Sequence, residues 1–226
     1  MNERNQHCKI YLIRHGQTDW NLAKRIQGSQ DIPLNETGKR QAALLAEGMR
    51  TRPVARFFSS PMKRARETAR AVADSQNVPL YLVDGLEEIH YGEWEGMTME
   101  EIRTRFPEEY TAWWKDPVNG APPGGESQME VLLRSARAME AIKADAAKDR
   151  AGAVAVVSHG AAICCILPWL LKEQALKEDG YSIINAAVTT IDYNMETGIC
   201  VLESLNDARH LEHFEEKERP GGTDVN

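Results

Sequence analysis

The sequence has no apolar run long enough to cross a bilayer. Its longest apolar stretch, at 161–171, is too short for a transmembrane helix and is interrupted by Pro168. The chain starts with polar residues and shows no apolar core of a secretion signal. We therefore expect a cytoplasmic protein that does not bind membranes.

Cysteine is scarce and has no metal-binding spacing. Of the 4 cysteines, Cys164 and Cys165 are adjacent, whereas Cys8 and Cys200 lie far apart, and no CxxC pair occurs. This usage is typical of reduced thiols in the cytosol. It favours neither a disulfide framework nor a metal site, and we expect no metal and no cofactor.

Positive charge is also in deficit, with 27 Lys and Arg against 34 Asp and Glu, which gives a net charge of -7. Such an acidic chain is a poor partner for nucleic acid and anionic membranes. A small anionic ligand remains compatible, because the charge inside a pocket can oppose the overall charge. Aromatic residues make up only 7%, but the hydrophobic content of 42% is ordinary for a globular domain.

Short apolar strands alternate with helical patterns over the first two-thirds of the chain. We expect strands at 9–13, 54–60, 80–83 and 153–158, and helices at about 37–50, from 60 onward, at 98–115, at 126–147 and after 160. This alternation predicts a parallel sheet covered on both faces. A probable hairpin at 182–206 makes the sheet mixed. The predicted fold is α/β, a three-layer α/β/α sandwich with a mixed, mostly parallel sheet.

The segment at about 92–125 breaks this rhythm and is rich in Trp, Pro and Gly. We interpret it as a lid-like insertion in a single domain that covers 1–206, followed by a charged, flexible tail at 207–226. Trp113 and Trp114 could pack within the insertion or take part in recognition. Together with Tyr91 and Trp94, they could instead build an aromatic pocket for a leaving group.

Three predicted strands end in residues suited to binding an anion. These residues are Arg14, His15 and Gly16 after the first strand, Ser60 and Arg64 after the second, and Ser158, His159 and Gly160 after the strand at 153–158. In the second group, Ser60 and Pro61 are typical of a helix start, with Ser at the N-cap. The carboxyl ends of parallel strands meet at one edge of a sheet. Two arginines and two histidines should therefore converge there, beside helix N-termini.

This set of side chains suits phosphoryl transfer. Two guanidiniums recognise a tetrahedral oxyanion, the glycines allow a close backbone approach, and a neutral imidazole can carry the phosphoryl group covalently. Glu88, just after the third strand, could protonate a leaving alkoxide as general acid. Each residue alone is more often structural, and the chemistry rests on their joint placement. Either His15 or His159 could be the nucleophile on this reasoning.

Six motifs occur in the order found in one enzyme family: RHGQTDWN, GSQDIPLNETGKRQA, SSPMKRARETA, EIHYGEWEG, GGES and VSHG. On these motifs the chain resembles the histidine phosphatase superfamily, in its phosphoglycerate-mutase-like branch. The resemblance implies that His15 accepts the phosphoryl group, that Arg14, Arg64 and His159 complete the phosphate pocket, and that Glu88 donates the proton. It also implies substrate-binding positions at Thr18, Asn21, Gln27, Gly28, Ser29 and Gly160.

Two departures from the mutase pattern favour a phosphatase. Cofactor-dependent mutases carry an Arg after the catalytic Glu, where this chain has Ile89. They also carry an Arg pair after a Trp in the inserted segment, and at the comparable place this chain has Trp114-Lys115, so the pair is reduced to one Lys. The loss of these cations favours transfer to water. The resemblance therefore predicts a metal-independent phosphomonoester hydrolase, either similar to α-ribazole phosphatase or broad in specificity. Its partner would be a small phosphomonoester, and the terminal hairpin could support a homodimer.

Three alternatives remain open at this stage. The first is a cofactor-dependent phosphoglycerate mutase, and the second is a non-catalytic scaffold that binds a phosphorylated ligand. The third is a metalloenzyme with His15, His159 and Glu88 as ligands, which the two nearby arginines would oppose by repelling a dication.

Overall fold

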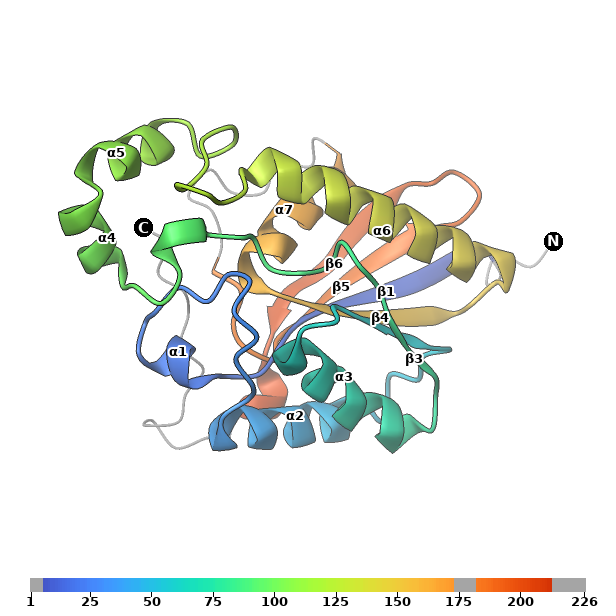
Figure 1. The fold of residues 1–226 in the computed structure, drawn as a ribbon. Coiled ribbons are helices and arrows are strands. Elements are labelled where there is room, and N and C mark those ends of the chain that lie inside the picture. Colours follow the sequence, from blue (N-terminus) through green and yellow to red (C-terminus); the bar gives the residue numbers. More distant parts are fainter. Residues whose placement is uncertain (1–5, 173–181, 213–226) are drawn as a thin grey trace.

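The structure is a computed structural model that describes residues 6–172 and 182–212 (Figure 1). The described residues form a six-stranded sheet in the order β3-β2-β4-β1-β5-β6. The strands are β1 (His7–Arg14), β2 (Phe57–Ser59), β3 (Leu80–Leu82), β4 (Ala153–Ser158), β5 (Val188–Asn194) and β6 (Cys200–Asp207). The pairs from β3 to β1 are parallel, and the β5–β6 hairpin adds antiparallel pairs. The predicted mixed sheet is confirmed.

Helices cover both faces of the sheet (Figure 1). One face carries α2 (Glu36–Gly48) and α3 (Lys63–Gln76), and the other carries α6 (Gln128–Lys148) and α7 (Gly160–Leu171). Because side chains alternate along a strand, β1 serves both cores. Ile10 and Leu12 join the cluster that includes α6 and α7, whereas Tyr11 and Ile13 join the cluster that includes α2 and α3. The three-layer prediction is confirmed.

The long helix expected at 126–147 is present as α6. Ser127 and Glu130 form a capping box at its start. The buried apolar positions are Val131, Ala138, Met139, Ile142 and Ala146. Leu133 is 54% exposed. Neighbouring leucines cannot all face one side of a helix, and the 3.6-residue period selects Val131 instead.

The predicted start of α3 is wrong. The helix begins at Lys63 with Met62 at the N-cap, and no side chain caps it. The Ser60 hydroxyl, expected to cap the helix, accepts from the Met62 N–H at 3.3 Å, before the helix begins, and lies 2.9 Å from His159 Nε2. Arg64 nevertheless lies in the first turn, as predicted.

The segment at 92–125 has a small core of its own. It contains a 3-10 turn η2 (Gly92–Trp94), α4 (Met99–Arg105) and α5 (Pro107–Lys115), so the helical stretch expected at 98–115 is divided into two helices at Pro107. Trp94 and Trp113 are buried together with Ile102, and their rings meet edge to face at 5.6 Å. Trp114 lies outside this core, and its side chain is 47% exposed. Packing therefore accounts for Trp94 and Trp113, and they do not form the aromatic pocket that we considered.

The chain stays ordered beyond the predicted end of the domain. Asp207 closes β6 and pairs with Arg52 at 2.7 Å. The turn η3 (Arg209–Leu211) then packs on α2 and buries Leu211. A flexible tail beginning at 207 is therefore wrong for 207–212, and the remainder of that prediction, 213–226, lies outside the described residues.

None of the four cysteines, which all lie within the described residues, takes part in a disulfide. None of the helices in the described ranges combines the length and the apolar content that a membrane span requires.

Candidate active site

The residues after three parallel strands meet at one edge of the sheet. Arg14 is the register partner of Ser158, and Ser59 is the partner of Val157. The next residue along β1 and β4 is a histidine, and the rings of His15 and His159 lie 5.1 Å apart between centroids. Both histidines are almost completely buried. The predicted convergence is present.

The ring of His15 is held in one tautomer. Its Nδ1 lies 2.7 Å from the Gly16 carbonyl oxygen. Because a carbonyl oxygen only accepts, Nδ1 carries the proton and Nε2 presents its lone pair. Burial, followed by the charges of Arg64 and Arg14, lowers the pKa of His15 well below its ordinary value. The ring is therefore neutral near pH 7, with a nucleophilic nitrogen.

The ring of His159 is held in the opposite tautomer. Arg64 Nε donates to His159 Nδ1 at 3.1 Å, so the proton of the neutral ring lies on Nε2 and faces the Ser60 hydroxyl. Burial and the charge of Arg64 lower the pKa of His159 well below its ordinary value. One histidine thus offers a lone pair at Nε2 and the other offers an N–H. The sequence could not distinguish the two in this way.

Arg64 is fully buried and fixed by backbone carbonyls. Its Nη1 donates to the Gln30 oxygen at 2.7 Å, and its Nη2 donates to the Gly28 oxygen at 2.9 Å. Burial lowers the pKa of Arg64 to about 10, so the guanidinium remains charged at neutral pH. The predicted site residue Gly28 therefore contributes through its carbonyl group.

Arg14 is also buried, and its Nη1 donates to the Ile183 oxygen. Its Nε has no hydrogen-bond partner in the part of the chain that the structure describes. A buried donor without a partner is costly, and an oxyanion bound beside His15 would supply the missing acceptor.

Gly16 does not have the role that we predicted, which was to allow a close approach of the backbone to a bound anion. A Cβ on Gly16 would lie 2.7 Å from the Gly38 carbonyl oxygen, so the close approach is between two segments of this chain. A Cβ on Gly160 would lie 3.5 Å from the guanidinium carbon of Arg14, which is ordinary contact. Gly160 opens α7 beside the site but is not required there for space.

Glu88 reaches the same edge from the segment after β3. Its carboxylate accepts hydrogen bonds from the backbone N–H groups of Ala162 at 3.0 Å and Ala161 at 3.3 Å. These groups belong to the first turn of α7, where the helix dipole favours negative charge. The carboxylate thus lies at the start of the helix that follows His159.

The loop after β1 orders several predicted binding residues. Thr18 caps the short helix α1 (Asp19–Leu22), and its N–H donates to Asn21 Oδ1 at 3.1 Å. The Thr18 hydroxyl donates to Gln27 Oε1 at 2.9 Å. These three residues are brought together. Ser29 is exposed, and its hydroxyl donates to Glu95 at 3.0 Å, so it faces away from this group.

Two residues that hydrogen-bond the backbone of the site were not predicted from the sequence. Asn185 is fully buried, and its Nδ2 donates to the His15 oxygen at 3.0 Å. Thr68 Oγ1 accepts from Gly16 N–H at 3.0 Å. Thr68 lies one turn after Arg64 and could have been found from that spacing. Asn185 is separated from His15 by 170 residues, and no local pattern signals it.

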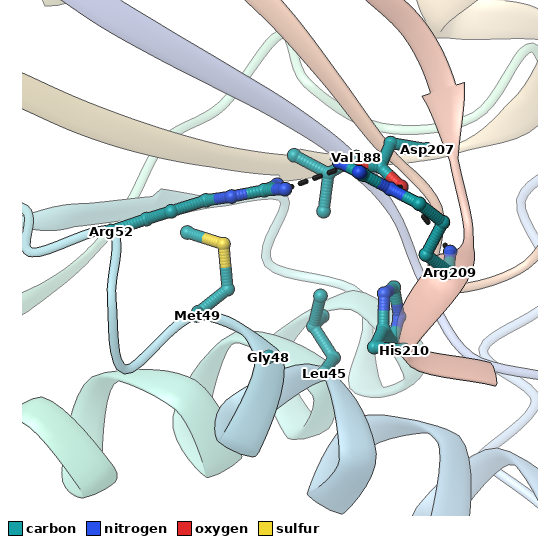
Figure 2. Close-up of a pocket in the computed structure, with 8 residues that line it drawn as sticks. All are labelled: Leu45, Gly48, Met49, Arg52, Val188, Asp207, Arg209 and His210. Carbon is teal, nitrogen blue, oxygen red and sulfur yellow. Dashed lines mark hydrogen bonds and ion pairs between the residues drawn. The ribbon is translucent and has the colours of Figure 1, made fainter.

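A separate cavity of about 280 Å³ lies beside the C-terminal end of α2 (Figure 2). Its charged residues are already paired, since Asp207 binds both Arg52 and Arg209 at 2.7 Å. The opposite end of α2 is the one near the site, where Asn35 donates to Gln17 at 3.0 Å. The cavity is therefore distinct from the histidine pair.

The cradle, by which we mean Arg14, His15, Arg64 and His159, can hold a tetrahedral oxyanion against a neutral nucleophile. Its cations come from protein side chains. Within residues 6–172 and 182–212, no cluster of three or more His, Cys, Asp or Glu side chains could hold a metal ion.

Comparison with known proteins adds a family match. The profile of the histidine phosphatase superfamily (branch 1) matches residues 10–208. A relative named "Probable phosphoglycerate mutase GpmB", from Yersinia pestis (strain Pestoides F), is 34% identical over 211 residues, which cover 90% of this chain and 95% of the relative.

Solved structures share the fold over nearly the whole chain. Bacillus stearothermophilus YhfR is 32% identical with a TM-score of 0.79, and the match covers 91% of this chain and 100% of that one. A mycobacterial glucosyl-3-phosphoglycerate phosphatase is 29% identical with a TM-score of 0.77, covering 89% and 99% respectively. The names of similar proteins thus include both a mutase and a phosphatase.

Proposed function

The chain belongs to branch 1 of the histidine phosphatase superfamily, and from this premise we propose that it is a metal-independent phosphomonoester hydrolase. The reaction proceeds through a phosphohistidine on His15. The observation that carries this proposal is the pair of opposite tautomers: His15 presents a lone pair, while His159 presents an N–H. Two buried guanidiniums flank this pair.

In the first step, His15 Nε2 attacks the phosphorus, so that a P–N bond forms and the ester P–O bond breaks. Arg14 and Arg64 stabilise the negative charge on the phosphoryl oxygens. The His159 N–H, which the Ser60 hydroxyl accepts in this structure, exchanges that acceptor for a phosphoryl oxygen. Glu88 acts as general acid and delivers a proton to the leaving alkoxide oxygen.

In the second step, water attacks the phosphorus of the phosphohistidine. Glu88, now a carboxylate, accepts a proton from the water, the P–N bond breaks, and inorganic phosphate leaves. His15 returns to its neutral form, and the Gly16 carbonyl keeps the proton on Nδ1 throughout.

The surroundings of Glu88 support a phosphatase over a mutase. Ile89, which occupies the position of a mutase arginine, is 1% exposed and packs in an apolar cluster with Val131 and Ala162. A cation for a substrate carboxylate is therefore missing at this position. The mutase remains the second candidate because of the GpmB relative.

The first experiment compares the wild-type protein with His15→Ala on p-nitrophenyl phosphate in the presence of EDTA, from about pH 4.5 to 8. We expect metal-independent turnover in the wild type and only background turnover in the variant. His7→Ala is the matched control, because His7 lies on the same strand with its side chain 45% exposed. Turnover that survives in His15→Ala would refute the nucleophile, and loss of wild-type activity with EDTA would refute metal independence.

A second experiment separates the two reactions. The protein is incubated with 3-phosphoglycerate and a 2,3-bisphosphoglycerate primer, and both 2-phosphoglycerate and inorganic phosphate are measured. We expect phosphate to accumulate without the isomer, and isomer formation as the main reaction would establish the mutase. A screen of small phosphomonoesters then tests whether the specificity is broad or similar to that of α-ribazole phosphatase. Phosphate binding without turnover of any ester would favour the scaffold.

A further inference from the structure

Arg134 on α6 lies outside the cradle, yet it binds the segment that carries Glu88. A guanidinium has five N–H donors, and all five of Arg134 have acceptors. Its Nη1 donates to the Gly85 and Glu87 carbonyl oxygens at 3.0 and 2.8 Å, and its Nη2 donates to the Glu88 carbonyl oxygen at 2.9 Å. The remaining donors, on Nε and Nη2, reach the two oxygens of Glu126, each at 2.9 Å.

Glu126 extends this arrangement to the far side of Glu88. Its carboxylate accepts from the His90 N–H at 3.0 Å, and its own N–H donates to the His90 oxygen at 2.7 Å. Burial alone would raise the pKa of Glu126, but Arg134 and the His90 N–H lower it below the ordinary value. The ion pair is therefore intact at neutral pH. Residues 85–90 are held on both sides of the Glu88 backbone.

The Glu88 side chain is fixed separately, at the first turn of α7. A proton donor must stay aligned with the leaving oxygen, and a displacement of about 1 Å can cost about 100-fold in rate. We propose that Arg134, together with Glu126, is a positioning residue that sets the place of Glu88 for proton transfer. This inference rests on the proposed function, because it assumes that Glu88 is the general acid.

The arrangement requires arginine rather than positive charge alone. Lysine has three donors on a flexible stem and cannot span three carbonyl groups and a carboxylate in one plane. Arg134→Lys therefore keeps the charge and removes the geometry, and Glu126→Gln keeps the shape and removes the ion pair. Arg137→Ala is the matched control, because Arg137 is exposed on the same helix.

The test compares esters that differ in their need for an acid. p-Nitrophenolate leaves readily without a proton, whereas an alkoxide such as that of glycerol requires one. In Arg134→Lys and Arg134→Ala we compare kcat/KM, because it reports the cleavage of the ester bond and not the later hydrolysis of the phosphohistidine, which both esters share. We expect kcat/KM to fall about 100-fold on glycerol phosphate and by less than fivefold on p-nitrophenyl phosphate. Glu126→Gln should follow the same pattern with a smaller fall, and Arg137→Ala should match the wild type. Equal losses on both esters, or no loss on either, would overturn the proposal.

Amide hydrogen exchange gives a readout that does not depend on turnover. In Arg134→Lys, amides at 85–90 should exchange faster, while those at 14–16 remain protected. Unchanged exchange at 85–90 overturns the proposal even if activity falls. Failure of the proposed function looks different: His15→Ala remains active or the wild type hydrolyses neither ester, whereas the exchange result stays interpretable.

Discussion

The cradle and the insertion at 92–125 are built in contrasting ways. In the cradle, His15, Arg64 and His159 come from three separate segments at the sheet edge, are buried, and bond mainly to backbone groups or to one another. The insertion instead encloses a small aromatic core of its own. It meets the loop after β1 through Arg25, which pairs with Glu101 at 3.0 Å, and through the Ile26 N–H bond to Met97 at 2.9 Å.

This contrast indicates which residues tolerate substitution and which do not. A change in the cradle leaves buried polar atoms without partners, so its residues cannot be exchanged one at a time. A change on the surface of the insertion disturbs few contacts. We infer that the reaction type belongs to the sheet edge, and that the choice of substrate can shift through the insertion.

The largest effect should come from breaking the cradle with Arg64→Ala. This change removes a fixed cation and leaves the Gly28 and Gln30 carbonyl oxygens without that donor. Loss of one preorganised donor costs about 10²–10³-fold, and we expect kcat/KM on p-nitrophenyl phosphate to fall by at least that much. Arg70→Ala, an exposed position on the same helix, should have no effect. A variant that keeps a tenth of the activity would contradict the role of Arg64.

Breaking the core of the insertion with Trp94→Ala should affect stability more than chemistry. Trp94 is fully buried, and truncation of a buried tryptophan costs about 3–5 kcal/mol. Urea unfolding should show this loss, and limited proteolysis should cut within 92–125. Phosphohistidine should still form on His15, and it can be detected after the reaction is stopped with alkali. If Trp94→Ala abolished phosphohistidine as completely as Arg64→Ala, the two regions would not be separable.

Acid should destabilise the fold through the cradle. The pKa of both His15 and His159 lies below its ordinary value in the folded state, because of burial first and then nearby arginine charge. Below about pH 6.5 the unfolded chain therefore binds more protons, and the free energy of unfolding falls by up to about 1.4 kcal/mol per pH unit for each histidine.

Denaturant titrations between about pH 6.5 and 5 measure this change of the free energy of unfolding with pH. His210 contributes to it as well, because burial also lowers the pKa of His210. His15→Gln should reduce the slope. An equal slope in that variant would mean that His15 is not neutral in the folded protein.

The smallest effect should follow Trp114→Ala, which tests whether the exposed surface of the insertion affects stability or catalysis. Trp114 is 47% exposed and stacks on Tyr110 at 6.2 Å between ring centroids. We expect a stability change within about 0.5 kcal/mol and an unchanged kcat on p-nitrophenyl phosphate. A rise in KM confined to esters with large leaving groups would show that the insertion contacts substrate, and a fall in kcat on both ester types would contradict the separation.

The arrangement of the cradle could be predicted because it depends on strand ends. Continuous apolar runs identified β1 and β4, and parallel pairing then placed Arg14 beside Ser158. Once the register is fixed, His15 and His159 follow one residue later. The same reasoning placed Arg64 correctly even though the capping role of Ser60 was wrong, because one helical turn tolerates a shift of two or three residues in its start.

Other features could not be predicted because they depend on pairing across long sequence separations. Nothing local indicates that Asn185 donates to His15 or that the guanidinium of Arg134 reaches the Glu88 backbone. The role of Trp113 could not be predicted for the same reason. An aromatic residue at helical spacing gives the same sequence pattern whether it packs in the core of the insertion or lines a substrate pocket. Tertiary contacts decide these cases.

The position of β1 has a consequence for biosynthesis. This strand is synthesised well before its two neighbours in the sheet, β4 at residues 153–158 and β5 at residues 188–194. Contacts of such high sequence separation form slowly, and β1 cannot pair on both sides until residue 194 has been synthesised. Translation products that end before residue 153 therefore contain His15 without His159 beside it, and the proposed reaction requires the completed sheet.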